Sequence, residues 1–127
     1  MPTMTAAAPA DVITLFAAAL HDGRLDDALA LYEPDAVFIA EPGAEPLHGL
    51  EQIRAALAGF AALRPTLTPE IRKVVQAGDI ATVLNHWTLD GTGPDGSPLR
   101  LSGTSADVLR RRPDGTWGLL IDDPWGA

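Results

Sequence analysis

The chain of 127 residues contains no cysteine, which excludes disulfide bonds, thiol nucleophiles and cysteine-ligated zinc. It also lacks any apolar run near the ~20 residues that a bilayer-spanning helix needs, so we expect a soluble protein with no membrane partner. Basic residues are scarce: nine stand against seventeen acids, giving a formal charge of −8. Such a surface repels the phosphate backbone of nucleic acids, so nucleic acid is not expected as a partner.

The first residues also lack the basic region and long apolar region of a secretory signal. We therefore expect a cytoplasmic protein whose residues 1–8 form a short flexible arm. The length and the absence of a linker or repeat predict a single domain over residues 1–127.

The first half of the chain has helical periodicity, with apolar residues recurring at steps of three and four. Asp11 is a candidate N-cap of the first helix, and Gly23 a candidate stop signal. Pro34 is expected to end the second helix, because proline disfavours helical geometry in the residue before it. A short apolar strand, residues 36–40, should follow. The predicted helices span residues 12–20, 25–32 and 50–61.

The second half is rich in β-branched residues and is divided by turn signals at Gly78-Asp79 and at Pro113-Asp114-Gly115. Helices followed by antiparallel strands predict an α+β domain. A lone curved sheet must cover one of its faces, so the three helices should pack against the concave side and leave a pocket.

Three motifs carry a family resemblance: "LYEPDAVF", "HGLEQIRAALAGF" and the final "DGTW…IDDPWG". In their order and spacing the sequence resembles the nuclear transport factor 2-like superfamily, in particular its SnoaL-like and ketosteroid isomerase-like branch. The resemblance implies a cone-shaped roll in which a curved, largely antiparallel sheet wraps around three N-terminal helices. It also implies a homodimer with an apolar pocket for a small apolar molecule, and no cofactor.

Comparison with ketosteroid isomerase gives a mixed result for the three catalytic roles of that enzyme, which are a carboxylate base, a tyrosine donor and a protonated aspartate donor. Phe16 stands where the tyrosine is expected and has no hydroxyl group. Glu41 is the nearest match to the base, displaced by about one position. Asp107 matches the protonated aspartate.

Counting along the strands gives a second view of the same site. If Asp114-Gly115 is a two-residue hairpin loop, Leu109 lies opposite Leu120 and Asp107 lies opposite Asp122, so that the two carboxylates face the same side. A three-residue loop with a bulge would instead shift the register by one residue and separate them.

The strand after Gly78-Asp79 places Leu84 and His86 on one face and Asn85 and Trp87 on the other. By comparison with the isomerase, the face with His86 is taken to be concave. Trp87, Trp117 and Trp125 are then expected to be core or dimer contacts.

The sequence therefore predicts a histidine and two carboxylates inside an apolar cavity, a combination suited to general acid and base catalysis. The predicted catalytic residues are His86, Asp107 and Asp122. The predicted ligand-binding residues are Phe16, Tyr32, Glu41, Leu84 and Leu120. No metal site is predicted, because a zinc site usually brings more histidine or cysteine.

Two functions remain open at this point. One is an isomerase, cyclase or hydratase that moves protons on a small apolar carbonyl compound. The other is a non-catalytic dimeric module that binds a small hydrophobic ligand. In that second case the polar residues would have purely structural roles: the two aspartates would bond the backbone or Arg110, and His86 would be a satisfied core residue.

Overall fold

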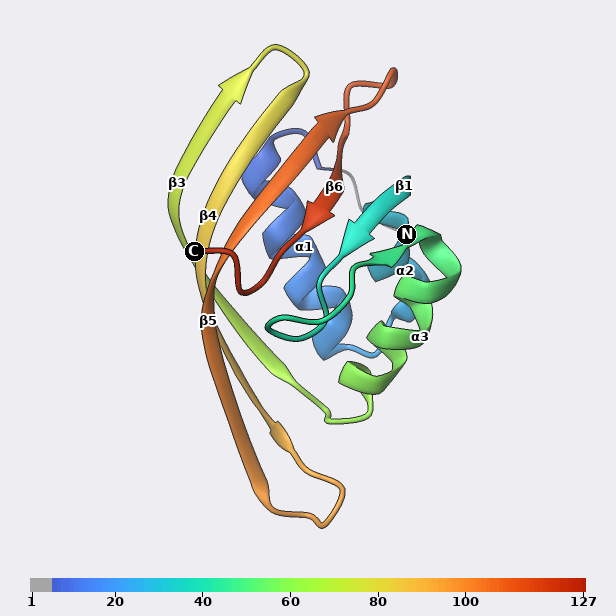
Figure 1. Cartoon of the computed structure of the whole chain (residues 1–127), viewed down its shortest axis with the longest axis vertical. Coiled ribbons are helices and arrows are strands. Elements are labelled where there is room, and N and C mark those ends of the chain that lie inside the picture. Colours follow the sequence, from blue (N-terminus) through green and yellow to red (C-terminus); the bar gives the residue numbers. More distant parts are fainter. Residues whose placement is uncertain (1–5) are drawn as a thin grey trace.

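A computed structural model describes residues 6–127 of the chain, in which helices lie at the start and most of the strands follow (Figure 1). The helices are α1 (Pro9–His21), α2 (Leu25–Ala30) and α3 (Gly49–Ala61). The strands are β1 (Tyr32–Phe38), β2 (Leu47–His48), β3 (Thr66–Ala77), β4 (Ile80–Thr92), β5 (Pro98–Arg111) and β6 (Trp117–Asp122). None of the helices in residues 6–127 is long and apolar enough to cross a bilayer.

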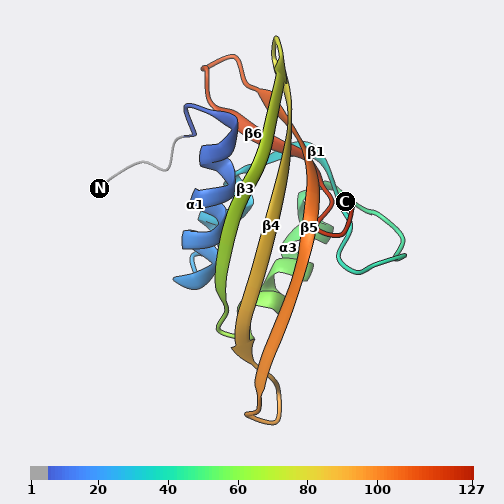
Figure 2. The ribbon, with the colours of Figure 1, turned by 90° about the vertical axis from the view of Figure 1, so that its left-hand side faces the viewer.

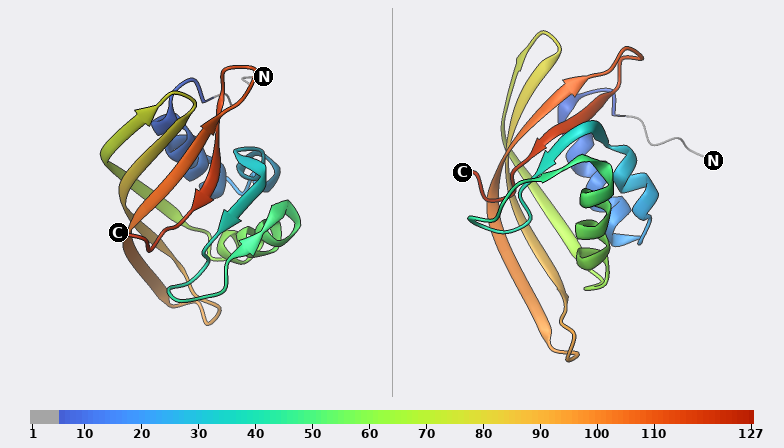
Figure 3. Two further views of the ribbon diagram at one scale, coloured as in Figure 1. Left: turned by 45° about the horizontal axis from the view of Figure 1, so that its top comes forward. Right: turned by 45° about the vertical axis from the view of Figure 1, so that its right-hand side comes forward.

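The strands form one curved sheet in the order β2-β1-β6-β5-β4-β3. Neighbouring strands are antiparallel except for β1 and β6, which run parallel, so the sheet is mixed. All three helices lie on one side of the sheet, and Figure 2 looks onto the opposite side of β3, β4 and β5, which no helix of the described residues covers. The predicted α+β fold with a curved sheet around three helices is confirmed (Figure 3).

Helix α1 begins earlier than predicted. Ala8 is its N-cap and Pro9 its first residue, a position where proline's missing N–H costs nothing. Asp11 lies three residues inside, and its carboxylate accepts the Ala8 N–H at 3.1 Å. Gly23, at φ 71°, ends the helix in the left-handed conformation as predicted.

The predicted N-terminal arm, residues 1–8, falls partly outside the described residues, which begin at residue 6. Ala6 is buried, and its carbonyl accepts the Trp117 N–H at 2.9 Å. The described end of the arm is therefore packed against β6.

The segment around Tyr32 differs from the prediction, which ended the second helix there. Helix α2 ends at Ala30, and Tyr32 is instead the first residue of β1, opposite Leu119. Pro34 lies where the pairing of β1 with β6 is irregular, a place that tolerates a residue with no N–H to donate. This change turns the Tyr32 side chain into the interior.

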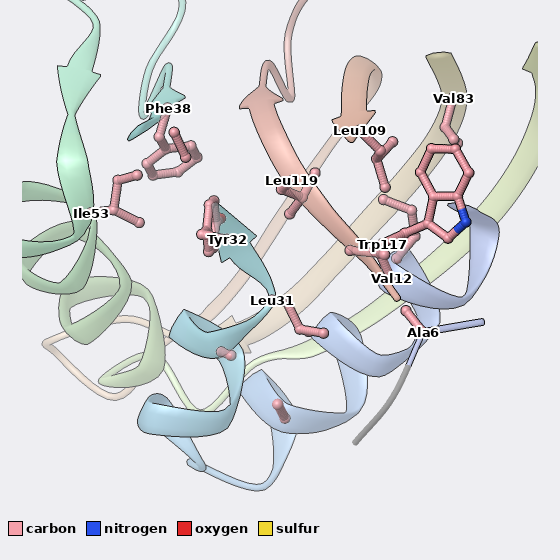
Figure 4. Packing of buried hydrophobic residues seen from close by; sticks show 14 of the residues in the cluster. Ala6, Val12, Leu31, Tyr32, Phe38, Ile53, Val83, Leu109, Trp117 and Leu119 are labelled. Carbon is pink, nitrogen blue, oxygen red and sulfur yellow. The ribbon is translucent and has the colours of Figure 1, made fainter. Parts of the chain in front are cut away.

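The main core lies between the helices and the concave face of the sheet (Figure 4). Val12 from α1 and Ile53 from α3 are fully buried there, together with Leu109 and Leu119 from the sheet. In Figure 4 the ring of Tyr32 lies between Ile53 and Leu119. Tyr32 thus carries a hydroxyl group into this apolar layer.

Candidate functional site

The β5–β6 hairpin positions the two candidate acids. Arg112 donates its N–H to the Thr116 carbonyl at 2.7 Å, so the loop between them has three residues, not the predicted two. Gly115 closes it at φ 86°, a conformation that favours glycine. This loop alone would turn Asp122 outward.

A β-bulge corrects the register further along the hairpin. Leu109 lies opposite Leu119, whereas Val108 lies opposite Ile121, so Leu120 is the extra residue on β6. The prediction that Leu109 faces Leu120 is therefore wrong. Beyond the bulge the register is the predicted one, and Asp107 and Asp122 come side by side.

We call Asp107 and Asp122 the acid pair. Both carboxyl groups are buried, with residue exposures of 3% and 7%, and they are hydrogen-bonded to each other. The Tyr32 hydroxyl donates to Oδ2 of Asp122. Oδ1 of Asp107 accepts the Asp123 N–H at 3.0 Å, which leaves Oδ2 of Asp107 to carry a proton toward its partner.

Burial raises the pKa of Asp122 to about 6, although the hydrogen bonds from Tyr32 and Asp107 lower it. Burial, and then the charge on Asp122, raise the pKa of Asp107 well above its usual range. Burial and the same charge raise the pKa of the Tyr32 hydroxyl well above its usual value. Near neutral pH the acid pair therefore shares one proton, with the charge mainly on Asp122.

The acid pair lies at the wall of an apolar cavity of about 90 Å³. The cavity is lined by α1, α3, the inner face of the sheet and the residues after β6. Five aromatic side chains take part in the lining: Phe16, Phe38, Phe60, Trp87 and Trp125. The polar side chains in the lining are Asn85, Ser105, Asp107 and Asp122.

His86 lies on the opposite face of the sheet, so the prediction that it shares the cavity with the acid pair is wrong. Asn85, opposite Ser105, is the residue of β4 that points inward, and it is buried. His86 pairs with Thr104 on the outer face, where its Nδ1 lies 3.2 Å from the Thr104 hydroxyl. Leu84 is on the same outer face and does not line the cavity.

Of the other predicted ligand-binding residues, one lines the cavity and three do not. Phe16 lines the cavity, and its ring meets that of Tyr32 edge-on at 5.9 Å. Tyr32 contributes its hydroxyl to the acid pair rather than a wall of the cavity. Glu41 is exposed in a loop, and Leu120 is the residue at the bulge, so neither lines the cavity.

Sequence reasoning placed Asn85 and Trp87 on the face away from the cavity, and it took Trp87 and Trp125 for core or dimer contacts. The Trp87 ring lines the cavity and packs edge-on against Trp125 at 5.0 Å, while its indole N–H donates to the Pro124 carbonyl at 2.8 Å. A signal was present: the alternate residues Ala81, Val83, Trp87 and Leu89 are apolar. The intervening set of β4 contains threonines and Asp90, as a solvent face would.

Arg110 does not contact the acid pair. It donates to buried Glu33 at 2.9 Å and to Asp35 at 2.7 Å. Arg112 completes the cluster by donating to Glu33 at 2.8 Å. Among residues 6–127, no group of three histidine, aspartate or glutamate side chains is arranged to hold a metal ion.

Comparison with known families finds that residues 13–117 match the SnoaL-like domain. No curated protein sequence matches the chain significantly. Solved structures share the fold. A conserved protein from Planctomyces limnophilus superposes with a TM-score of 0.80 at 22% identity, over 87% of each chain.

Two further structures agree. A ketosteroid isomerase-like protein from Erwinia carotovora has a TM-score of 0.76 at 19% identity, over 87% of each chain. A nuclear transport factor 2-like protein with a cystatin-like fold from Novosphingobium aromaticivorans has a TM-score of 0.74 at 19% identity, over 88% of this chain and 75% of that one. At these identities the likeness concerns the fold alone.

Proposed function

Because the chain belongs to the SnoaL-like domain family, we propose that it is an enzyme that moves a proton on a small, neutral, mainly apolar molecule, in an isomerisation, cyclisation or dehydration. The observation that carries this proposal is the buried acid pair, which shares a proton at the wall of an apolar cavity. Two titrating groups whose environments separate their pKa values are suited to act as base and acid in one site.

In this proposal Asp122 is the base. Its pKa of about 6 leaves it mostly ionised at neutral pH, yet more basic than an ordinary aspartate. Tyr32 is a positioning residue, because its hydroxyl donates to Asp122 and so fixes the carboxylate. Asp107 stays protonated and supplies the acid that returns a proton or steadies negative charge on the substrate.

The surroundings of the acid pair favour a neutral substrate. Within residues 6–127, no lysine, arginine or histidine lines the cavity, so an anion would meet a negative carboxylate without compensation. A cation would pair with Asp122 and remove its basicity. The predominance of rings in the wall suits a flat, apolar body.

The test follows loss of the α-proton NMR signal of cyclopentanone in D₂O, a reaction that needs only a base and stabilisation of an enolate. We expect exchange above the buffer rate in the wild type. The Asp122→Asn variant should be slower by roughly 10²- to 10⁴-fold, since it keeps an oxygen for Tyr32 but cannot take a proton. The matched control is Asp95→Asn, the same chemical change at an exposed position in the turn between β4 and β5. Equal rates in the Asp122→Asn variant and the wild type would reject the proposal.

A binding module without chemistry is the second candidate, and the cavity size favours it. The cavity of about 90 Å³ is smaller than the ~150 Å³ apolar cavity known to hold benzene. The walls must therefore move before a molecule of the size of benzene, or a larger one, can bind. Phe16 also stands where ketosteroid isomerase is expected to have a tyrosine, so the site lacks that hydrogen-bond donor. Saturable binding of cyclopentanone without catalysed exchange would favour this function.

We also propose that two copies of the chain associate through the outer face of the sheet. Val75, Thr82, Val108 and Ile121 form a row across β3, β4, β5 and β6 on that face, and we call this row the outer stripe. Val75 and Ile121 are 51% and 38% exposed in the single chain. A second copy would cover these apolar side chains.

A further inference from the structure

Asn85 is a polar residue in an apolar part of the sheet. It points inward from β4, is 5% exposed and lines the cavity. It is also the one asparagine in the sequence. A buried amide costs free energy unless its donors and acceptors find partners, so its hydrogen bonds need to be accounted for.

The oxygen of the Asn85 side-chain amide already has a hydrogen-bond partner. The side-chain oxygen accepts the Glu70 N–H at 2.9 Å, and since a backbone N–H can donate only to the oxygen, the orientation of the amide is fixed. Within residues 6–127 the amide nitrogen makes no hydrogen bond. No side-chain nitrogen or oxygen in that range is both sealed from solvent and without a partner. The NH₂ group is therefore accessible from the cavity.

Strand pairing places this NH₂ group near the acid pair. Asn85 lies opposite Ser105, and Val83 lies opposite Asp107, so Asn85 and Asp107 are diagonal neighbours on one face. Diagonal neighbours in an antiparallel pair are ~7–8 Å apart, a span that a small ring can bridge. The Ser105 hydroxyl between them donates to the backbone carbonyl of Asn85 at 3.3 Å.

We propose that Asn85 determines specificity by donating its free N–H to an oxygen acceptor of the ligand, which makes a small, neutral carbonyl compound the preferred occupant. The location of the ligand rests on the proposed function, but the hydrogen bond requires no catalysis. The indole N–H of Trp87 is already taken by Pro124, so it does not compete for the carbonyl oxygen. Oriented this way, the ligand holds its carbonyl near Asn85 and its adjacent C–H groups toward the acid pair.

The experiment titrates the protein with cyclopentanone and, in parallel, with methylenecyclopentane, which has nearly the same shape and no oxygen. The readout is the side-chain amide region of a ¹⁵N–¹H spectrum. Three NH₂ groups contribute to it, those of Asn85, Gln52 and Gln76, and both glutamines are exposed and serve as internal references. We expect cyclopentanone to shift the Asn85 signals in a saturable way and to bind roughly five- to tenfold more tightly than the hydrocarbon.

The Asn85→Asp variant separates recognition from structure. It keeps an oxygen for the Glu70 N–H but has no NH₂ group, so the ketone should lose its advantage over the hydrocarbon. Gln76→Glu, the same chemical change at an exposed position, should leave the advantage intact.

Three outcomes would overturn the proposal. The first is a saturable shift of the Trp87 and Trp125 indole signals while the Asn85 signals stay in place. The second is an equal preference for the ketone in the wild type and the Asn85→Asp variant. The third is the absence of any shift with either compound. If cyclopentanone shifts the Asn85 signals but exchanges its α-protons no faster than in buffer, the proposed catalysis is rejected. The proposed hydrogen bond from Asn85 to the ligand then still holds.

Discussion

At the scale of single residues, the site depends on the hydroxyl group of Tyr32, a residue predicted to lie at the end of a helix. Phe16 lacks the hydroxyl that its position suggested, and the Tyr32 hydroxyl reaches the acid pair from the start of β1. The bond from Tyr32 lowers the pKa of Asp122 against the larger effect of burial, which raises it. A hydrogen bond to a charged group contributes about 1.5–3 kcal/mol, enough to shift a pKa by about one unit or more.

The Tyr32→Phe variant should therefore raise the pKa of Asp122 above its value of about 6. Since a base acts in its deprotonated form, proton exchange should increase with pH through the pKa of Asp122, and the midpoint should move upward by about one unit in the variant. The measurement is the pH dependence of kcat/KM for exchange. Phe16→Leu, which changes the cavity wall without touching Asp122, is the control and should keep the midpoint. An unchanged midpoint in Tyr32→Phe would contradict this role.

At the scale of the elements, close packing between β5 and the Trp87 ring closes one side of the cavity. A Cβ atom added at Gly103, which lies opposite Trp87, would be 2.9 Å from the ring and 3.2 Å from the Pro124 carbonyl. The glycine thus allows β4, β5 and the C-terminal segment to meet over the cavity.

The Gly103→Ala variant should lower the free energy of unfolding by about 1–3 kcal/mol, because the ring and the Pro124 segment must both shift. Gly59→Ala is a matched control in α3, where the added Cβ meets nothing within 4 Å. That change should raise stability by about 0.5–1 kcal/mol, since alanine favours helix. Urea unfolding of both variants gives the comparison. Equal stabilities for the two would show that the packing at Gly103 is loose.

The elements also show how far sequence reasoning reaches. Helical spacing and turn signals were enough to predict the α+β class and the hairpins, because periodicity directly reflects which side is buried. The neighbouring positions of Asp107 and Asp122 were expected from a two-residue loop, but the structure reaches them through a three-residue loop and a bulge at Leu120. The predicted loop was one residue too short and the bulge was not predicted, and these two errors cancel in the register. Nothing in the local sequence specifies such a bulge.

His86 shows the opposite failure. Its face was chosen by likeness to another enzyme, although the alternation of apolar residues in β4 favoured the other side. Because side chains alternate along a strand, one wrong choice of face exchanged every residue of β4, so that Leu84 and His86 replaced Asn85 and Trp87 in the predicted site. The free amide of Asn85 could be recognised only once Glu70 was found opposite His86 on β3.

At the scale of the whole molecule, the helices lie on one side of the sheet, and the outer stripe lies on the other side, where residues 6–127 leave Val75 and Ile121 exposed. The formal charge of −8 opposes association of two copies, so salt should strengthen the dimer by screening their repulsion. Apolar burial favours association and is much less sensitive to modest salt.

The Val75→Lys variant should weaken dimerisation at least tenfold, because it places a charge in the outer stripe. Val74→Lys is the control: Val74 lies on the other face of the same strand and is 43% exposed, so the same change there should leave association unaffected. Sedimentation velocity over a range of concentrations measures both. A wild-type chain that remains a monomer at the highest attainable concentration would contradict the proposed interface.

The bulge at Leu120 has a consequence for how the hairpin tolerates changes in length. Removal of Leu120 alone would leave Leu119 and Ile121 in a regular ladder, with Asp107 and Asp122 still on the inner face. Insertion of one residue at the same point, with the bulge retained, would place Asp122 opposite Ala106 and turn it to the outer face, although both members of the acid pair remained in the sequence. A one-residue deletion at Leu120 should therefore keep the two carboxyl groups side by side, whereas an insertion that retains the bulge should separate them.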